Sequence, residues 1–213
     1  MTKANRTNLI ITILIAIVAI SGILGILKLA REYPENTSTT SDMMHNYLFP
    51  HARVIQPFVL KSGANMFTDH SLKGHWSLVF FGYTHCPDIC PTTLSTMKKV
   101  WETLTPQAQS ELQMVFVSID PERDTPDSVQ QYAAYFNPHF IGATGAVSQL
   151  TQLTAQMGVA YFKVPGTDEQ HYELNHTGSL MIFNPLGQYA GVISPPLAAG
   201  NIAAELEKII ASN

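Results

Sequence analysis

Cysteine is scarce in this chain, because only two of its 213 residues, Cys86 and Cys90, carry thiols. Two cysteines so close in sequence cannot form the disulfide framework that holds small secreted domains together. A four-cysteine zinc site is excluded as well, since it needs a second pair. The two thiols are therefore interpreted as a functional pair.

Positive charge is also in short supply. Lysine and arginine total 12 while aspartate and glutamate total 16, which gives a formal net charge of −4 and a pI near 6.0. Proteins that bind nucleic acids usually carry a basic surface. Nucleic acid is therefore not an expected partner.

A long uncharged run of Ile, Leu, Val and Ala is present near the N-terminus, from Leu9 to Leu27. Its length suits a helix that crosses a bilayer. Lys3 and Arg6 precede the run, and Lys28 and Arg31 follow it, so the positive charges do not decide the orientation. A cleavable signal peptide is the alternative, but the run is long for one and no A-x-A site follows. An uncleaved membrane anchor is favoured.

These features predict four segments along the chain. They are a short tail (1–8), a transmembrane anchor (9–30), a polar linker (31–46) and one folded domain (47–213). Met43, Met44 and His45 in the linker offer soft metal donors. We favour the interpretation that these three residues are ordinary linker residues and not metal ligands.

The folded domain is organised around residues 77–91, SLVFFGYTHCPDICP. The apolar run predicts a buried strand that ends at Gly82, and Pro91 is suited to the first turn of a helix. Thiols at the start of a helix have a lowered pKa. Cys86 and Cys90 are four residues apart, so on a helix both sulfurs face one ion. Thioredoxin-type dithiols have two intervening residues, whereas this pair has three.

Two thiolates leave a soft metal under-coordinated, and one imidazole would complete a three-coordinate Cu(I) site. An added weak ligand would also allow Cu(II). His176, on a loop directly before an apolar strand, is the preferred candidate among eight histidines, but spacing alone leaves the choice open. The alternatives are His85 beside Cys86, four histidines in polar stretches and one in a charged loop: His51, His70, His75, His139 and His171.

The rest of the domain predicts strands that alternate with helices. The expected elements are a hairpin (55–68), helices (91–105, 125–136, 146–157 and 196–211), strands (112–119, 140–143 and 159–164) and a second hairpin (176–193). This order is typical of an α/β sheet of the thioredoxin type. In such a sheet the loop that carries the thiols lies at the edge where functional sites form.

Three stretches carry a resemblance to a known family: FFGYTHCPDICPTTL, SIDPERDTP and YELNHTGSLMIFNPLGQY. Together they resemble the Sco/SenC family of cytochrome c oxidase copper chaperones, from about Pro57 to the C-terminus. The resemblance implies a thioredoxin-like fold with one N-terminal anchor helix and a domain outside the cytoplasm. It also implies that Cys86, Cys90 and His176 bind copper and that Asp120 supports the copper site and the thiol chemistry.

One position departs from the family pattern. The family usually has an acidic residue directly before the ligand histidine, where this chain has Asn175. The change removes a negative charge beside the metal, so copper affinity or partner docking is expected to differ. Asp88, between the cysteines, keeps the family's residue and is interpreted as a loop-capping residue.

The leading hypothesis is a metallochaperone that passes copper to the dinuclear copper site of cytochrome c oxidase subunit II. Further expected partners are a periplasmic thiol reductant and another copper chaperone. The N-terminus lacks an Arg/Ser-rich transit segment, which favours a bacterial inner membrane with the domain in the periplasm. A thiol–disulfide oxidoreductase that reduces the acceptor's cysteines is the alternative. A peroxidase-like or redox-signalling protein is the weakest hypothesis.

Overall fold

The computed structural model describes Gly25 and residues 47–166 and 172–212. Apart from Gly25, the predicted tail, membrane anchor and linker lie outside the described residues. In the part of the chain that is described, no helix has the length and apolar character needed to cross a bilayer.

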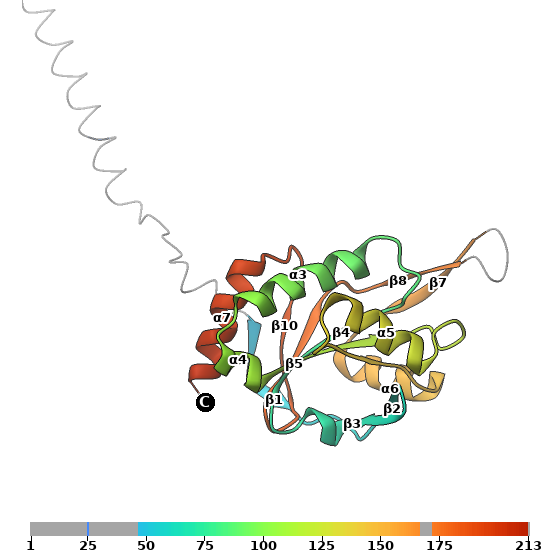
Figure 1. Ribbon diagram of the computed structural model, residues 1–213, viewed down its shortest axis with the longest axis horizontal. Coiled ribbons are helices and arrows are strands. Elements are labelled where there is room, and N and C mark those ends of the chain that lie inside the picture. Colours follow the sequence, from blue (N-terminus) through green and yellow to red (C-terminus); the bar gives the residue numbers. More distant parts are fainter. Residues whose placement is uncertain (1–24, 26–46, 167–171, 213) are drawn as a thin grey trace, which may run out of the picture. The chain divides into compact units, whose positions relative to one another are not determined.

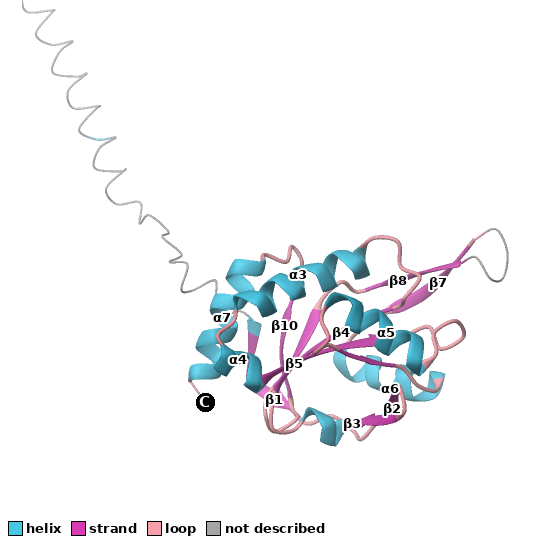
Figure 2. Cartoon of the chain, in the orientation of Figure 1, coloured by secondary structure: helices cyan, strands magenta, loops and turns pink. Residues whose placement is uncertain are grey.

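A six-stranded mixed sheet forms the centre of the domain (Figure 1, Figure 2). In spatial order its strands are β1 (Leu48–Arg53), β10 (Tyr189–Ile193), β9 (Leu180–Phe183), β4 (Trp76–Gly82), β5 (Leu112–Ser118) and β6 (Ile141–Ala143). Strands β4, β5 and β6 run parallel, while the pairs β4–β9, β9–β10 and β10–β1 are antiparallel. The mixed α/β sheet agrees with the predicted thioredoxin-like class.

Two hairpins and six helices complete the described fold. The hairpins are β2 (Val59–Ser62) with β3 (Asn65–Thr68), and β7 (Tyr161–Pro165) with β8 (Tyr172–His176). The helices are the 3-10 helix η2 (Asp69–Leu72), α3 (Ile89–Thr103), α4 (Pro106–Glu111), α5 (Pro126–Phe136), α6 (Val147–Met157) and α7 (Ala199–Ala211).

The central strands are buried on both faces, and successive side chains alternate between two cores. In β4, Leu78 and Phe80 belong to a core formed with residues of α3, α5 and α7. Val79 and Phe81 belong to the opposite core, formed with residues of α6 and of the β2–β3 and β7–β8 hairpins. Both cores therefore pack against β4, the strand that leads to the cysteines.

The register of β4 and β5 brings the next two loops together. Trp76 pairs with Leu112, and the pairing continues in step to Gly82 opposite Ser118. Parallel strands end at the same edge of a sheet, so the loop that follows Gly82 lies beside the loop that follows Ser118. The first loop carries the thiols and the second carries Asp120.

Most predicted elements are present, with differences in detail. The first hairpin strand begins at Val59 and not at Ile55. The helix predicted over 91–105 begins earlier, at Ile89, and ends at Thr103, and α4 then forms a separate helix. The last helix begins at Ala199 and not at Pro196. Strands β1 and β8 were not predicted.

Candidate metal site

The two cysteines lie on either side of the start of α3. Asp88 occupies the position before the first helical residue, and Cys90 lies in the first turn. The backbone N–H of Cys90 points at Cys86, with 3.4 Å between the nitrogen and Sγ. Unpaired N–H groups and the helix dipole make this end of the helix positive. Both sulfurs therefore lie where a thiolate is stabilised, as the sequence predicts.

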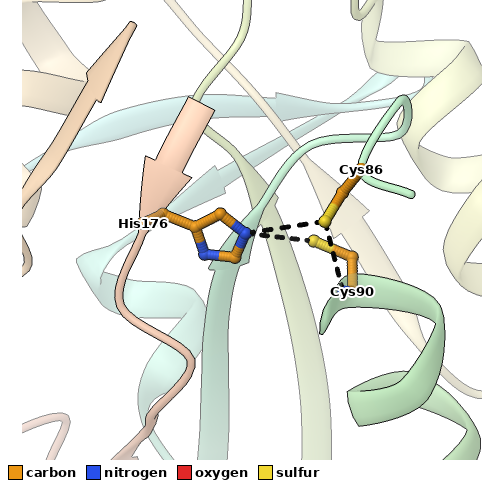
Figure 3. Close-up of side chains that lie close together, drawn as sticks. All are labelled: Cys86, Cys90 and His176. Carbon is orange, nitrogen blue, oxygen red and sulfur yellow. Dashed lines mark hydrogen bonds between the residues drawn. The ribbon is translucent and has the colours of Figure 1, made fainter. Parts of the chain in front are cut away.

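The third donor comes from a distant part of the chain. His176 is the last residue of β8, where it pairs with Tyr161 of β7. The prediction that it lies on a loop was wrong. Its Nε2 atom lies 3.8 Å from Sγ of Cys86 and 3.5 Å from Sγ of Cys90 (Figure 3). All three donor atoms lie within 4.8 Å of one another. The structure thus brings together the three predicted ligands.

The tautomer of His176 follows from its other ring nitrogen. Nδ1 lies 3.2 Å from the carbonyl oxygen of Thr177. A carbonyl oxygen only accepts hydrogen bonds, so Nδ1 carries the proton. The neutral ring therefore presents an unprotonated Nε2 to the thiols, which is the arrangement that a metal-binding histidine needs.

Close packing fixes the histidine and one thiol. The ring of His176 contacts Phe80 at a centroid distance of 5.9 Å and Tyr83 at 5.8 Å. Gly82 ends β4 directly beneath Cys90, where an added Cβ would lie 2.4 Å from the sulfur. Only glycine leaves room for Cys90 at this position.

The two thiols differ in proton affinity. A hydrogen bond from the Cys90 thiol, together with those from the backbone N–H groups of Cys90 and Asp88, lowers the pKa of Cys86 to about 3. The same thiol pairing and burial raise the pKa of Cys90. Cys90 is fully buried, whereas Cys86 is partly exposed. Cys86 is therefore the thiolate that a partner can reach, and Cys90 retains its proton until a metal replaces it.

Asp120 is buried beside this site but does not touch the thiols. One carboxylate oxygen accepts from Arg123 Nε at 2.6 Å, and the other accepts from the Tyr172 hydroxyl at 2.6 Å. The Arg123 guanidinium lies 5.6 Å from the centre of the Tyr83 ring, which in turn packs against His176. Asp120 is thus connected to the site through Arg123 and Tyr83, and its predicted supporting role stays a prediction.

A second acid, Asp124, holds the thiol loop, and sequence reasoning missed it. Its side chain has no exposed surface, and it accepts hydrogen bonds from the Thr84 backbone N–H at 2.9 Å and from the hydroxyls of Thr84 and Ser118. These contacts connect the loop after β4 to the end of β5. The motif SIDPERD contains both acids, but only the fold distinguishes which one reaches the thiol loop.

The remaining histidines lie elsewhere in the described structure. His85 is exposed and lies 3.5 Å from Asp124. His139 stacks on Trp101, and His70 lies 3.8 Å from Asp69. His51 and His75 are exposed, while His171, Met43, Met44 and His45 lie outside the described residues.

Asn175 and Asp88 both lie next to ligands. Asn175 is exposed and alternates with the buried His176 along β8, so its side chain lies on the other face of the strand. Asp88 begins α3 without a side-chain cap, and its carboxylate accepts from the Thr92 hydroxyl at 3.3 Å.

Comparison with known proteins identifies the family. The SCO1/SenC family profile matches residues 48–211. The chain belongs to this family. It is 37% identical over 171 residues to a Stutzerimonas stutzeri protein named for copper binding, a match that covers 79% of this chain and 83% of that protein. The match spans less than two thirds of the length of the SCO2-like relatives from Rickettsia.

Solved structures of Sco proteins share the fold. Apo Sco1 of Thermus thermophilus has a TM-score of 0.71 and 30% sequence identity. The match covers 78% of this chain and 96% of the Thermus chain. Bradyrhizobium japonicum ScoI with copper bound has a TM-score of 0.66 and 33% sequence identity. The match covers 73% of this chain and 99% of the ScoI chain. Two sulfurs and one imidazole suit copper, particularly Cu(I). The donor set of this chain therefore supports the predicted copper cofactor.

Proposed function

We propose that this protein is a copper metallochaperone that holds copper through Cys86, Cys90 and His176. The convergence of two sulfurs and one imidazole nitrogen within 4.8 Å carries the proposal. A three-coordinate site leaves room for an incoming ligand from an acceptor. The exposure of Cys86 supports transfer, because a partner's thiolate can reach a copper ion on that side.

The acceptor we propose is the dinuclear copper site of cytochrome c oxidase subunit II. The support is the family, whose members include a human protein named SCO1 homolog, together with the resemblance to chaperones of the oxidase. A periplasmic thiol reductant and a second copper chaperone would supply electrons and copper. We further propose that residues 9–30 anchor the chain in a bacterial inner membrane, that residues 31–46 are the linker and that the domain faces the periplasm.

Copper stoichiometry of the full chain tests the ligand set. The reduced protein is equilibrated with Cu(I) under competition from a chelator, beside Cys86→Ser, Cys90→Ser and His176→Ala. His139→Ala is the matched control, because this histidine is exposed and stacks on Trp101. One tightly bound ion, retained in the control and lost in the three variants, is expected. Stoichiometric binding by His176→Ala would remove that residue from the ligand set.

A second candidate function is thiol–disulfide exchange, favoured by the unequal thiols. Cys86, with its low pKa, would attack an acceptor disulfide, forming a mixed disulfide and releasing one acceptor thiolate. Cys90 would then give up its proton and displace the second acceptor sulfur. The acceptor gains two electrons and the Cys86–Cys90 pair becomes a disulfide, which an external dithiol would reduce. His176→Ala separates the functions, since disulfide reduction does not need the imidazole as a ligand.

A further inference from the structure

His85 is an exposed histidine joined directly to the ligand Cys86. Its side chain is 57% exposed, yet one edge of the ring is held by the protein. Nδ1 lies 3.1 Å from the Thr84 hydroxyl and 3.5 Å from the buried carboxylate of Asp124. An exposed histidine ordinarily has no such support, so this geometry requires an explanation.

The contacts fix which ring nitrogen carries the proton. The Thr84 hydroxyl has a single hydrogen and donates it to Oδ1 of Asp124. Toward His85 the hydroxyl oxygen therefore accepts, and Nδ1 is the donor. The neutral ring is left with an unprotonated Nε2, which has no hydrogen-bond partner among the described residues. A carboxylate behind a histidine is the usual support of a metal-binding imidazole.

His176 and His85 thus each leave Nε2 as the available donor atom, one beside buried thiols and one on an exposed ring. His176, with Nδ1 held by a backbone carbonyl, aims Nε2 at the buried thiols. His85, with Nδ1 hydrogen-bonded to Thr84 and close to Asp124, keeps its other nitrogen on an exposed ring. The three-donor group is largely enclosed, since Cys90 is fully buried and His176 is only 8% exposed.

We propose that His85 is a transient copper ligand, through which the ion enters and leaves the group formed by Cys86, Cys90 and His176. The proposal rests on the metallochaperone function and adds a step to it. A bond from Cu(I) to Nε2 of His85 forms as a bond to a ligand of the donor breaks. A bond to Sγ of Cys86 then forms as Nε2 releases the ion. Copper remains Cu(I) throughout, because only ligands are exchanged.

A ligand that is absent from both end states affects rates and leaves the equilibrium unchanged. Removing Nε2 raises the barrier of loading and of release by the same amount, so both rates fall equally. We expect His85→Ala and His85→Asn to keep the wild-type Kd for Cu(I) and to slow both rates about tenfold, equal to about 1.4 kcal/mol of barrier. Asparagine is informative because its amide can donate to Thr84 from near the Nδ1 position while lacking Nε2.

The experiment measures equilibrium and rates on the full reduced chain. Loading is followed by stopped flow from the Cu(I) complex of bicinchoninate, and release is followed into excess bathocuproine disulfonate. His75→Ala is the matched control, because His75 is exposed and precedes β4, at the end of the strand opposite the thiols. Urea unfolding of each variant establishes that it is folded.

Slow exchange in both His85 variants, with unchanged Kd and a wild-type control, supports the transient ligand. Wild-type rates in His85→Asn overturn it, since that variant lacks Nε2. Equal slowing in His75→Ala overturns it as well, because the effect would then not belong to this position. Failure of the wild-type chain to bind Cu(I) overturns the metallochaperone function itself, whereas normal binding with unchanged rates overturns only the role of His85.

Discussion

At the scale of single residues, two identical side chains have been given different properties by their surroundings. Cys86 accepts hydrogen bonds from the Cys90 thiol and backbone, which stabilises its charged form. Cys90 is enclosed between Gly82 and the aromatic core, where a charge is unfavourable. One cysteine is therefore prepared for attack or exchange, while the other supplies a proton and then a second donor.

The lowered pKa of Cys86 predicts a particular pH dependence of alkylation. Below its pKa, a thiol with an ordinary pKa near 9 becomes about tenfold more reactive with each unit by which the pH rises. A thiol with a pKa of about 3 is already deprotonated, so iodoacetamide should label Cys86 at a nearly constant rate from pH 5 to 8. Mass spectrometry of the apo protein gives the site. First labelling at Cys90, or a rate that rises tenfold from pH 6 to 7, would contradict this.

Asp124→Ala should destabilise the domain strongly. Buried donors of Thr84 and Ser118 lose their acceptor, and each such loss costs about 1–3 kcal/mol. We expect the free energy of unfolding to fall by about 3 kcal/mol in urea titrations. Asp127→Ala is the control, because Asp127 is exposed in the first turn of α5 and should change stability by less than about 1 kcal/mol. Equal losses in the two variants would refute this role.

The sequence alone identified some residues of the site and its surroundings but not others. The thiols were identified as a pair from their closeness in sequence and the proline after each, but Cys86 lies before α3, so the helical i and i+4 argument was wrong for it. His176 needed the family resemblance, since its place depends on the pairing of β7 with β8, which no local pattern specifies. Asp124 and Tyr172 were missed because their contacts join loops that are distant in sequence.

At the scale of elements, the end of β4 limits what the site can tolerate. A Cβ on Gly82 would lie 2.4 Å from the sulfur of Cys90 and 2.8 Å from Cε2 of Phe116. Because β4 is fixed by its neighbours on both sides, Cys90 must move if anything fills this space. A backbone position without chemistry of its own thus determines where a ligand lies.

Gly82→Ala should weaken copper binding and stability together. Overpacking a core costs about 1–3 kcal/mol, and displacement of the sulfur should lower the affinity for Cu(I) by at least about tenfold. Chelator competition and urea titration measure the two effects. Gly200→Ala is the control, since no atom lies within 4 Å of its added Cβ. Wild-type copper affinity in Gly82→Ala would show that the sulfur relaxes without loss.

Elements with local signals were predicted well. Helix α5 begins at Pro126 after Thr125, whose side chain accepts from the Ser128 N–H, so its start is encoded in adjacent residues. Gly158 ends α6 with a φ of 68°, a conformation that favours glycine. Strand β1, LFPHAR, lacks an alternating pattern and is a strand because a partner lies beside it. Strand β8, YELNH, does alternate between buried and exposed residues, but over five residues only.

At the scale of the whole molecule, copper would join two segments that are far apart in the chain. Cys90 and His176 are separated by 86 positions. An ion that binds the folded state stabilises it by an amount set by its concentration relative to Kd. At a free Cu(I) concentration of 100 times Kd, the free energy of unfolding should rise by about 2.7 kcal/mol.

Urea titrations with and without Cu(I) check this prediction in the wild-type chain and in His176→Ala. The variant lacks the imidazole and is expected to lose tight binding of Cu(I) to the folded state, so it should gain little. An equal gain in the two proteins would mean that the imidazole contributes nothing to holding the ion.

The position of His176 near the end of the chain has a consequence for biosynthesis. Translation proceeds from the N-terminus at roughly 5–20 residues per second, so the thiols are made about 4–17 s before the histidine that completes the set. A ribosome product that stops short of β8 contains both sulfurs but cannot close the site around an ion. The proposed three-donor copper site therefore forms only after β8 has been made, and chains that end before it lack the imidazole.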